Sequence, residues 1–451
     1  MSTNTLRRIS SISVKSLFGM FDYDLDTQVN EEDKVKNIVI LYGDNGTGKS
    51  TLLKLAFHMI APDQIAGHKT YLLNTEFNTL TVRFNDGSEV RAKREKDIIS
   101  GAYKLEVKRP RKKVISANVA PSRELENEHE ELHNKIEPAL KELDCALYLL
   151  SDDRAIHRAG AAITRSERRR EMIYIDDNDY TDVSRRRSRI ETVYETPEDI
   201  SKKLLEIAIK RTEGWFRQRI IGSGARGDLG VNELYAKILK RISASGGDKT
   251  QAATKKQIEK RINMLSKSSK DYSQYGLLPE FESQEILSIL NAADTQTYNV
   301  IADVLSPYLD SIETKNQAME YIYKRIDTFV TVASKFYTNK SLSFDLRKGI
   351  KITASNGKNI EPSMLSSGER HLLLLFCTSI VAGEAPSILM IDEPEISLNI
   401  KWQRMLIDSL IQCIGDNDIQ FVFSTHSLEI LAKHKSGVVK LQNKKSRSRH
   451  D

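Results

Sequence analysis

The stretch Leu41-Tyr42-Gly43-Asp44-Asn45-Gly46-Thr47-Gly48-Lys49-Ser50-Thr51 separates two segments of opposite character. Before it, Asn37-Ile38-Val39-Ile40 has the apolar, β-branched composition of a buried strand. After it, residues 52–57 have the apolar spacing of a helix. The sequence therefore predicts a strand, a glycine-rich loop and a helix in that order, which is a unit of an α/β fold.

This loop has the composition of a phosphate-binding site. Gly43, Gly46 and Gly48 allow the backbone to turn its N–H groups and the start of the helix towards anionic phosphates. In such a loop the lysine, here Lys49, reaches the β- and γ-phosphates, and the serine, here Ser50, holds a Mg²⁺ ion. A glycine turn that merely precedes Lys-Ser is the structural alternative, and the strand and helix on either side make it the weaker one. The sequence predicts nucleotide binding.

The bulk properties indicate an ordinary globular protein of several units. A chain of 451 residues suggests two or three units. It has no signal-peptide pattern and no apolar run that approaches a membrane span, so we expect a cytoplasmic protein without membrane contact. Cys145, Cys377 and Cys413 lie far apart, with no CxxC pair, which indicates a reducing compartment and no structural zinc. The net charge of +6 supports nucleic-acid binding only weakly.

Residues 1–157 read as a first lobe that contains the glycine loop. We expect an antiparallel strand pair over residues 8–26, a hairpin turn at Asn85-Asp86-Gly87 and a charged helix over 123–143. Further strands are predicted over residues 70–73, 79–84, 89–93, 103–107, 113–115 and 145–150.

Residues 158–337 read as a large helical insertion. Helical spacing is found over residues 200–221, 232–242, 255–265, 282–292 and 318–336. Polar breaks at 222–230 and 243–250 predict several helices, with an antiparallel coiled-coil hairpin as one arrangement, and no single long arm.

Residues 338–451 return to an α/β pattern. We expect a hairpin over 341–353 and a basic tail from 444. Between them, helices are predicted over 368–381, 401–414 and 428–432, and strands over 387–391, 420–423 and 438–441.

An apolar strand in this last region ends in two acids, Asp392 and Glu393. In a phosphate-binding α/β fold the first acid of such a pair holds Mg²⁺, and the second is free to orient or deprotonate the attacking water. The alternative is an acid pair on the surface, without a function, at the end of a buried strand. The glycine loop elsewhere in the chain favours the metal-binding interpretation over this one.

Two further stretches could contact an anion. Leu365-Ser366-Ser367-Gly368-Glu369 precedes a helix and reads equally well as a cap, and His426 follows a strand, where a lone histidine is more often structural.

Taken together and in this order, these motifs resemble those of ATP-binding-cassette (ABC) ATPases, in the branch of SMC, Rad50 and OLD-type proteins. The resemblance covers about residues 1–157 and 338–451. It implies an α/β ATPase head with a mixed sheet and an antiparallel β subdomain, interrupted by the helical insertion. It also implies ATP and Mg²⁺ as cofactors, and a dimer in which each ATP lies between the Walker A loop of one chain and the signature of the other. By this resemblance the catalytic residues are Glu393, His426 and Lys49, the metal ligands are Ser50 and Asp392, and the nucleotide-binding residues are Gly43, Asn45, Gly46, Gly48, Lys49, Ser50, Thr51, Ser366 and Gly368.

The sequence departs from the commonest form of these motifs. The signature has Ser367 and Glu369 where glycine and glutamine are usual, a variant associated with the OLD-like branch. The stretch from Asp392 to Leu398 resembles that branch's DEPE-x-x-L-H, with Asn399 in place of the histidine. No glutamine can be assigned as the Q-loop residue of ABC ATPases. The segment Ser151-Asp152-Asp153-Arg154 is a candidate to take the place of that glutamine, with little in the sequence to support it.

No Toprim nuclease pattern, such as OLD nucleases carry, follows His426, so we expect an ATPase that acts on a separate effector. The layout resembles the stand-alone ATPase subunits of bacterial antiphage systems: AriA of PARIS first, PtuA of Septu or retron-Septu second. This resemblance implies a homo-oligomeric sensor, a Toprim-like or HNH effector nuclease as partner, and a phage protein as trigger. The alternative is a RecF- or Rad50-like DNA-binding ATPase of repair. The basic runs at 108–113, 164–170 and 184–189 would then contact phosphates, although a solvated charged face explains each run better.

Overall fold

The structure is a computed structural model that describes residues 7–27, 37–62, 68–121, 131–160, 197–227 and 255–443. The chain forms two compact units: Met1–Leu205 with Ser366–Asp451, and Glu206–Leu365. The second unit begins and ends later than the insertion expected over 158–337, and the three-part division stays a prediction. Several expectations fall outside the described residues: the basic runs at 164–170 and 184–189, the helix over 232–242, the break at 243–250, the start of the helix from 123, and the tail from 444.

A mixed six-stranded sheet forms the centre of the first unit, and its strands β15, β3, β14, β13 and β8 all run parallel. The sixth strand, β9, is antiparallel to β8. Every residue of β8, β13 and β14 is buried, as expected for strands covered on both faces. In sheet order the strands are β15 (Val438–Lys440), β3 (Ile38–Tyr42), β14 (Ile419–Thr425), β13 (Ser387–Asp392), β8 (Ala146–Leu150) and β9 (Ile156–Ala159).

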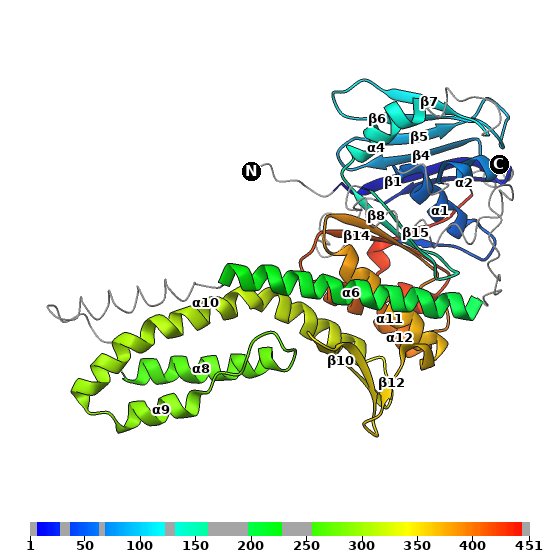
Figure 1. The fold of residues 1–451 in the computed structure, drawn as a ribbon. Coiled ribbons are helices and arrows are strands. Elements are labelled where there is room, and N and C mark those ends of the chain that lie inside the picture. The colour runs from blue at the N-terminus through cyan, green and yellow to red at the C-terminus, as the bar shows by residue number, and fades with distance from the viewer. Residues whose placement is uncertain are drawn as a thin grey trace, which may run out of the picture. The chain divides into compact units, whose positions relative to one another are not determined.

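An antiparallel six-stranded sheet forms the second layer of this unit (Figure 1). The expected strand pair over residues 8–26 and the turn at Asn85-Asp86-Gly87 are confirmed, and Gly87 has the positive φ, 83°, that this turn requires. The strand expected over 113–115 begins only at Ile115. In sheet order the strands are β2 (Phe21–Asp26), β1 (Ile9–Leu17), β4 (Thr79–Phe84), β5 (Glu89–Lys93), β6 (Tyr103–Lys108) and β7 (Ile115–Val119).

The helix α1 (Lys49–Ile60) joins the two sheets into one core. Its Leu52 and Phe57 are fully buried with Leu105 of the antiparallel sheet and Val422 of the mixed sheet. The helix that starts at the glycine loop is thus held rigidly on both sides. Apart from α2 and the start of α6, which are described below, the other helices of this unit among the described residues are η1 (Leu132–Ile136), α4 (Glu137–Lys141), α11 (Ser367–Ala382), α12 (Ile400–Ile414), α13 (Leu428–Leu431) and η3 (Lys435–Gly437).

The strand expected over 70–73 is wrong, because these residues belong to the helix α2 (His68–Asn74). Lys69 is buried, and its Nζ donates hydrogen bonds to the carbonyls of Met59 at 2.8 Å and Ala61 at 2.9 Å, at the end of α1. Leu72 is buried one turn later on the same face. This tertiary contact outweighs the strand propensity of Thr-Tyr-Leu-Leu.

The second unit is helical, with a small antiparallel sheet. Arg261 of α8 pairs with Asp310 of α10, and Tyr275, just beyond α8, bonds Asp327 further along α10, so α8 and α10 run parallel. The helix α9 connects α8 to α10 in sequence and packs against α8, and Figure 1 shows α8 between α9 and α10. The hairpin expected over 341–353 is confirmed. The elements are α6 (Pro197–Gly227), α8 (Lys255–Ser273), α9 (Ser283–Ala292), α10 (Thr295–Ser334), β10 (Lys340–Asp345), β11 (Gly349–Ala354), β12 (Asn359–Ile360) and η2 (Pro362–Met364), and the unit boundary falls within α6.

Three helices are longer than the sequence indicated. The helix expected over 255–265 is α8, which continues to Ser273. The break expected from Gly222 is wrong over its first part, since α6 continues to Gly227. A Cβ on Gly224 would lie 3.3 Å from the Met319 side chain, so this glycine allows a close approach to α10. The helix expected over 318–336 is the second half of α10, which has 40 residues and contains Pro307.

Two general features of the described residues bear on the class of protein. None of their helices has the length and apolarity to cross a membrane. The three cysteines are buried, and none of them forms a disulfide.

Candidate nucleotide-binding site

The fold brings the motifs together at one edge of the mixed sheet. The strands β3, β14, β13 and β8 are parallel, so their carboxyl ends meet there. In the register, Asp392 of β13 lies opposite Ser424 of β14, and Thr425 of β14 lies opposite Tyr42 of β3. The glycine loop, the acid pair and His426 therefore follow neighbouring strands.

The side chain of Lys49, directly after the loop, folds back and bonds to the start of the loop from Gly43 to Gly48. Lys49 Nζ donates hydrogen bonds of 2.8 Å to the carbonyls of Gly43 and Asp44. Gly46 and Gly48 have φ values of 78° and 80°, a conformation that glycine adopts readily. The Tyr23 hydroxyl donates to the carbonyl of Thr47 at 2.9 Å and braces the loop from β2. Asn45 is exposed on this loop, while Ser50 and Thr51 lie in the first turn of α1.

Ser50 and Asp392 are in direct contact, although the sequence separates them widely. Ser50 Oγ donates to Asp392 Oδ1 at 2.9 Å, while Asp392 Oδ2 is buried without a hydrogen-bond partner among the described residues. Burial raises the pKa of Asp392 to about 6, against the opposing effect of the neighbouring Ser424 and Ser50 hydroxyls. A serine hydroxyl beside a buried carboxylate with a free oxygen fits Mg²⁺, which takes few protein ligands and completes its shell with waters and phosphates.

Glu393 follows directly and is held in an unusual backbone conformation. Its φ is 45°, which is rare for a residue other than glycine, and its N–H donates to the Ser424 carbonyl at 2.8 Å. Its Oε1 lies 3.8 Å from Nδ1 of His426. The hydrogen bond to the neighbouring strand holds Glu393 in this conformation, which sets the direction in which its side chain projects.

The signature residues have contacts of another kind. Ser366 caps α11 in a reciprocal capping box with Glu369, a role that a glutamine could also fill. A Cβ on Gly368 would lie 2.4 Å from the carbonyl oxygen of Ser397, which follows the acid pair. In the part of the chain that the structure describes, no hydrogen bond joins Ser366 or Gly368 to residues 43–51. The other predicted site residues all lie at the carboxyl edge of the mixed sheet, whereas, within the described ranges, Ser366 and Gly368 make no hydrogen bond to the glycine loop there.

The segment Ser151–Arg154, the weak Q-loop candidate, contacts both groups. Asp152 Oδ1 accepts a hydrogen bond from Lys54 of α1 at 2.7 Å. Burial alone would raise the pKa of Asp152, but the hydrogen bond and charge of Lys54 hold it below its ordinary value. Two residues later, Arg154 Nη2 donates to the hydroxyls of Ser367 at 2.9 Å and Ser397 at 3.1 Å. The turn after β8 thus joins the nucleotide-loop helix to the start of the signature helix.

Phe18 is a candidate site residue that the sequence reasoning missed. It lies in the turn after β1 with a φ of 52°, a conformation that a bulky side chain rarely adopts. Its ring carbon Cε2 would be 3.5 Å from a Cβ on Gly48, at the start of α1. An apolar residue in a short turn is the only sequence signal, and it does not reveal the positive φ.

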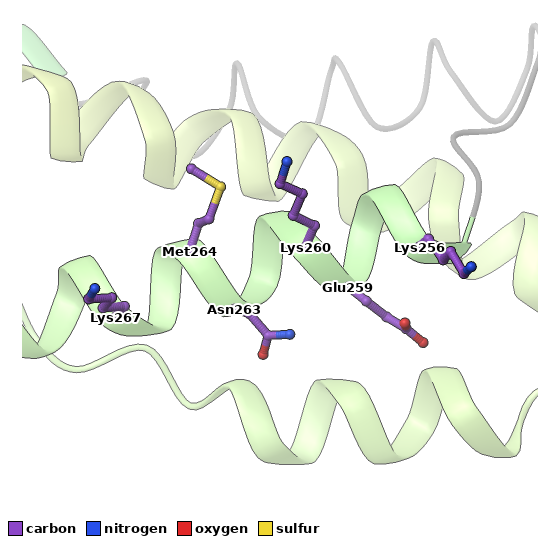
Figure 2. Close-up of a pocket in the computed structure, with 6 residues that line it drawn as sticks. All are labelled: Lys256, Glu259, Lys260, Asn263, Met264 and Lys267. Carbon is purple, nitrogen blue, oxygen red and sulfur yellow. The ribbon is translucent and has the colours of Figure 1, made fainter.

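A hollow of about 450 Å³ on the surface of α8 has a different character (Figure 2). Its lining residues all come from one face of that single helix: Lys256, Glu259, Lys260, Asn263, Met264 and Lys267. They belong to the second unit, whereas the motif residues belong to the first. The hollow is an open, mainly basic helix face and contains none of the chemistry described above.

Comparison with solved structures finds SMC heads at low similarity. The Smc head with an extended coiled coil bound to the C-terminal domain of ScpA, from Pyrococcus furiosus, has 14% identity and a TM-score of 0.38, with 98% of each chain covered. The Smc head with a coiled coil and joint from Pyrococcus yayanosii has 12% identity and a TM-score of 0.37, with 97% of each chain covered. The SmcHead bound to the C-winged helix domain of ScpA has 12% identity and a TM-score of 0.34, covering 98% of this chain and 99% of that one. No curated protein sequence matches.

A family model matches residues 38–432. This range contains the glycine loop, both acids at the end of β13, and His426, and it spans well over half of the chain. The chain therefore belongs to the family described as "AAA domain, putative AbiEii toxin, Type IV TA system".

Proposed function

We propose that the chain binds ATP with Mg²⁺ at the edge of the mixed sheet and hydrolyses it. The observation that carries the proposal is the 2.9 Å contact between Ser50 of the glycine loop and Asp392 at the end of β13. These are the residue types that hold Mg²⁺ in phosphate-binding loops, and the fold has brought them together from opposite ends of the chain.

Each side chain has a separate task in this proposal. Lys49, now bonded to two loop carbonyls, exchanges them for the β- and γ-phosphate oxygens. Ser50 and Asp392 hold Mg²⁺, which neutralises phosphate charge when bound. Glu393 accepts a proton from the attacking water, and His426 donates to an oxygen of the γ-phosphate. The phosphate-facing N–H groups of the loop orient the nucleotide.

The lysine supplies the first test. Lys49→Ala is expected to remove nucleotide binding, because it deletes the charge that the loop places against the phosphates. Titration of a fluorescent ATP analogue with and without Mg²⁺ measures the affinity. Lys69→Ala is a poor control because Lys69 caps α1, whereas Lys256→Ala on the exposed face of α8 leaves the site untouched and should bind normally. Undiminished binding by Lys49→Ala would contradict the proposal.

We further propose that two chains close around two ATP molecules, with Ser366 and Gly368 of one chain facing the glycine loop of the other. What supports this is that Ser366 and Gly368 have no hydrogen bond to residues 43–51 of their own chain in the described part. The Arg154 contacts at Ser367 and Ser397 would link this surface to the acid-pair loop of the same chain. ATP then promotes the closed dimer, and hydrolysis reopens it.

On this basis we propose a sensor or scaffold that controls a separate effector, an effector nuclease of antiphage defence. The support is the family description, which names a toxin–antitoxin system, together with a fold whose described part offers a nucleotide switch. The test is affinity purification from cells that also express the flanking genes, followed by mass spectrometry. A nuclease-like protein in stoichiometric amount is the expected result. Recovery of the chain alone, or with DNA, would instead favour the repair alternative.

A further inference from the structure

Glu395 lies two residues after Glu393, yet its environment is entirely different. Its side chain is only 5% exposed and lies against the turn that follows β14. Its Oε1 accepts hydrogen bonds from Thr425 Oγ1 at 2.5 Å, from the N–H of His426 at 3.0 Å and from the N–H of Ser427 at 3.2 Å. Three successive residues thus donate to one oxygen, and the turn that carries His426 is fixed by the loop that carries Glu393.

The same oxygen also lies close to the imidazole. Nδ1 of His426 is 3.3 Å from Oε1 of Glu395, nearer than the 3.8 Å to Oε1 of Glu393. Oε2 of Glu395 is buried and has no hydrogen-bond partner among the residues described. A buried carboxylate with one unpartnered oxygen keeps a strong negative potential, because little solvent screens it. That potential favours a proton on the nitrogen that faces it.

We propose that Glu395 is a positioning residue that holds His426 with Nδ1–H towards its carboxylate and Nε2 towards the nucleotide. The proton on Nδ1 fixes the tautomer, as the orienting partner of a functional histidine does elsewhere. When Nε2 is also protonated, Glu395 stabilises the imidazolium, which donates Nε2–H to a γ-phosphate oxygen. The inference rests on the proposed ATPase function. In this proposal the two acids have different roles: Glu393 accepts a proton from the attacking water, and Glu395 orients His426.

A purely structural role for Glu395 is the competing explanation, and the isosteric variant separates the two. Glu395→Gln keeps a carbonyl oxygen that can accept from Thr425 and from the two backbone N–H groups, so the turn stays fixed. It removes the negative charge that faces His426. Glu137→Gln is the matched control, because Glu137 is another buried carboxylate of the first unit, bonded to Lys141 and His133 and not to the turn that carries His426.

The kinetic test is a double-mutant cycle of Glu395→Gln and His426→Gln, with kcat and KM for ATP measured at saturating Mg²⁺. Glu395→Gln is expected to lower kcat about 10- to 100-fold, the range seen when an orienting partner is removed. KM should change little, because the phosphates are held mainly by the glycine loop. The double variant should be no slower than His426→Gln alone. The proposal is overturned if the double variant loses the product of the two single losses in kcat, or if Glu395→Gln has the kcat of the wild type.

A second measurement does not depend on hydrolysis and is read from the wild-type protein. Two-bond ¹H–¹⁵N correlation spectra of the wild-type protein with ¹⁵N-labelled histidine distinguish a protonated Nδ1 from a bare one. The signal of His426 is identified by its absence from the spectrum of His426→Gln. A protonated Nδ1 supports the proposal, and a bare Nδ1 overturns it. Absence of ATP hydrolysis by the wild-type protein would refute the proposed function, while this spectrum would still decide how Glu395 and His426 are arranged.

Discussion

Gly368 has no room for a side chain, and this gives the signature a structural constraint at the residue scale. A Cβ there would lie 2.4 Å from the backbone oxygen of Ser397 and 3.3 Å from the ring of Trp402. Gly368→Ala is therefore expected to destabilise the protein by about 1–3 kcal/mol, since backbone must move to accept the methyl group. Denaturant unfolding followed by circular dichroism measures the change.

Gly214 is the matched control for that substitution. It lies within α6, has no atom within 4 Å of the Cβ position and has no positive φ. Gly214→Ala is expected to stabilise the protein by up to about 1 kcal/mol, because alanine has the higher helix propensity. Equal stabilisation by both substitutions would contradict the close approach of the Gly368 Cβ position to the backbone oxygen of Ser397.

From the sequence alone, the residues of the strongest motifs could be proposed as site residues, but the residues that contact them could not. Lys49, Ser50, Asp392 and Glu393 could be singled out because residue type and spacing carry the chemistry. Arg154 could not be assigned, because its contact at Ser367 is 213 residues away in sequence. The role of Glu395 likewise depends on the parallel pairing of β13 with β14, which a single sequence does not show.

At the scale of elements, the end of α1 carries a histidine cluster made of His58, His68 and His157, on α1, α2 and β9; His68 is buried and the other two are half-buried. Nδ1 of His58 lies 2.8 Å from Nδ1 of His68. Burial lowers the pKa of His58 to about 3, and the pKa values of His68 and His157 are also lowered, chiefly by burial. The nearby charges of Lys54 and Lys69 add to the effect.

These shifts predict a loss of stability in mild acid. Above pH 6.5 the three histidines are neutral in both the folded and the unfolded state. Below it the unfolded state takes up protons that the folded state refuses, so the free energy of unfolding falls by up to about 1.4 kcal/mol per pH unit for each histidine. Urea unfolding at pH 7.5 and pH 5.5 measures the slope. His157→Gln should flatten it, whereas His133→Gln, at an exposed position, should not. An equal slope in wild type and His157→Gln would contradict this account.

The elements also show where local pattern fails. A run of apolar residues was enough to predict the buried strands β8, β13 and β14, because a strand covered on both faces is mostly apolar. Local pattern misassigned α2, whose state depends on Lys69 reaching the end of α1. It also ended α6 too early at Gly222, since glycine in a helix can serve a close contact as well as a break.

At the scale of the whole molecule, the proposal predicts an ATP-dependent change of oligomeric state. With ATP and Mg²⁺, the Glu393→Gln protein is expected to sediment at twice the mass of the chain, because the closed dimer forms and is not reopened by hydrolysis. With ADP in place of ATP, or with the additional substitution Lys49→Ala, the protein should have the same sedimentation coefficient as it has without nucleotide. Analytical ultracentrifugation makes the comparison. An unchanged sedimentation coefficient in ATP would exclude the nucleotide-bridged dimer, although not ATP binding by the single chain.

The central claim is that the edge of the mixed sheet is an Mg²⁺-dependent ATP hydrolysis site with Glu393 as the base. The most direct test measures bound ATP and released phosphate in parallel for the wild type and Glu393→Gln. The account predicts that Glu393→Gln binds ATP as the wild type does and releases phosphate at least about 100-fold more slowly, as expected for loss of a general base. Phosphate release at the wild-type rate by purified Glu393→Gln would contradict it.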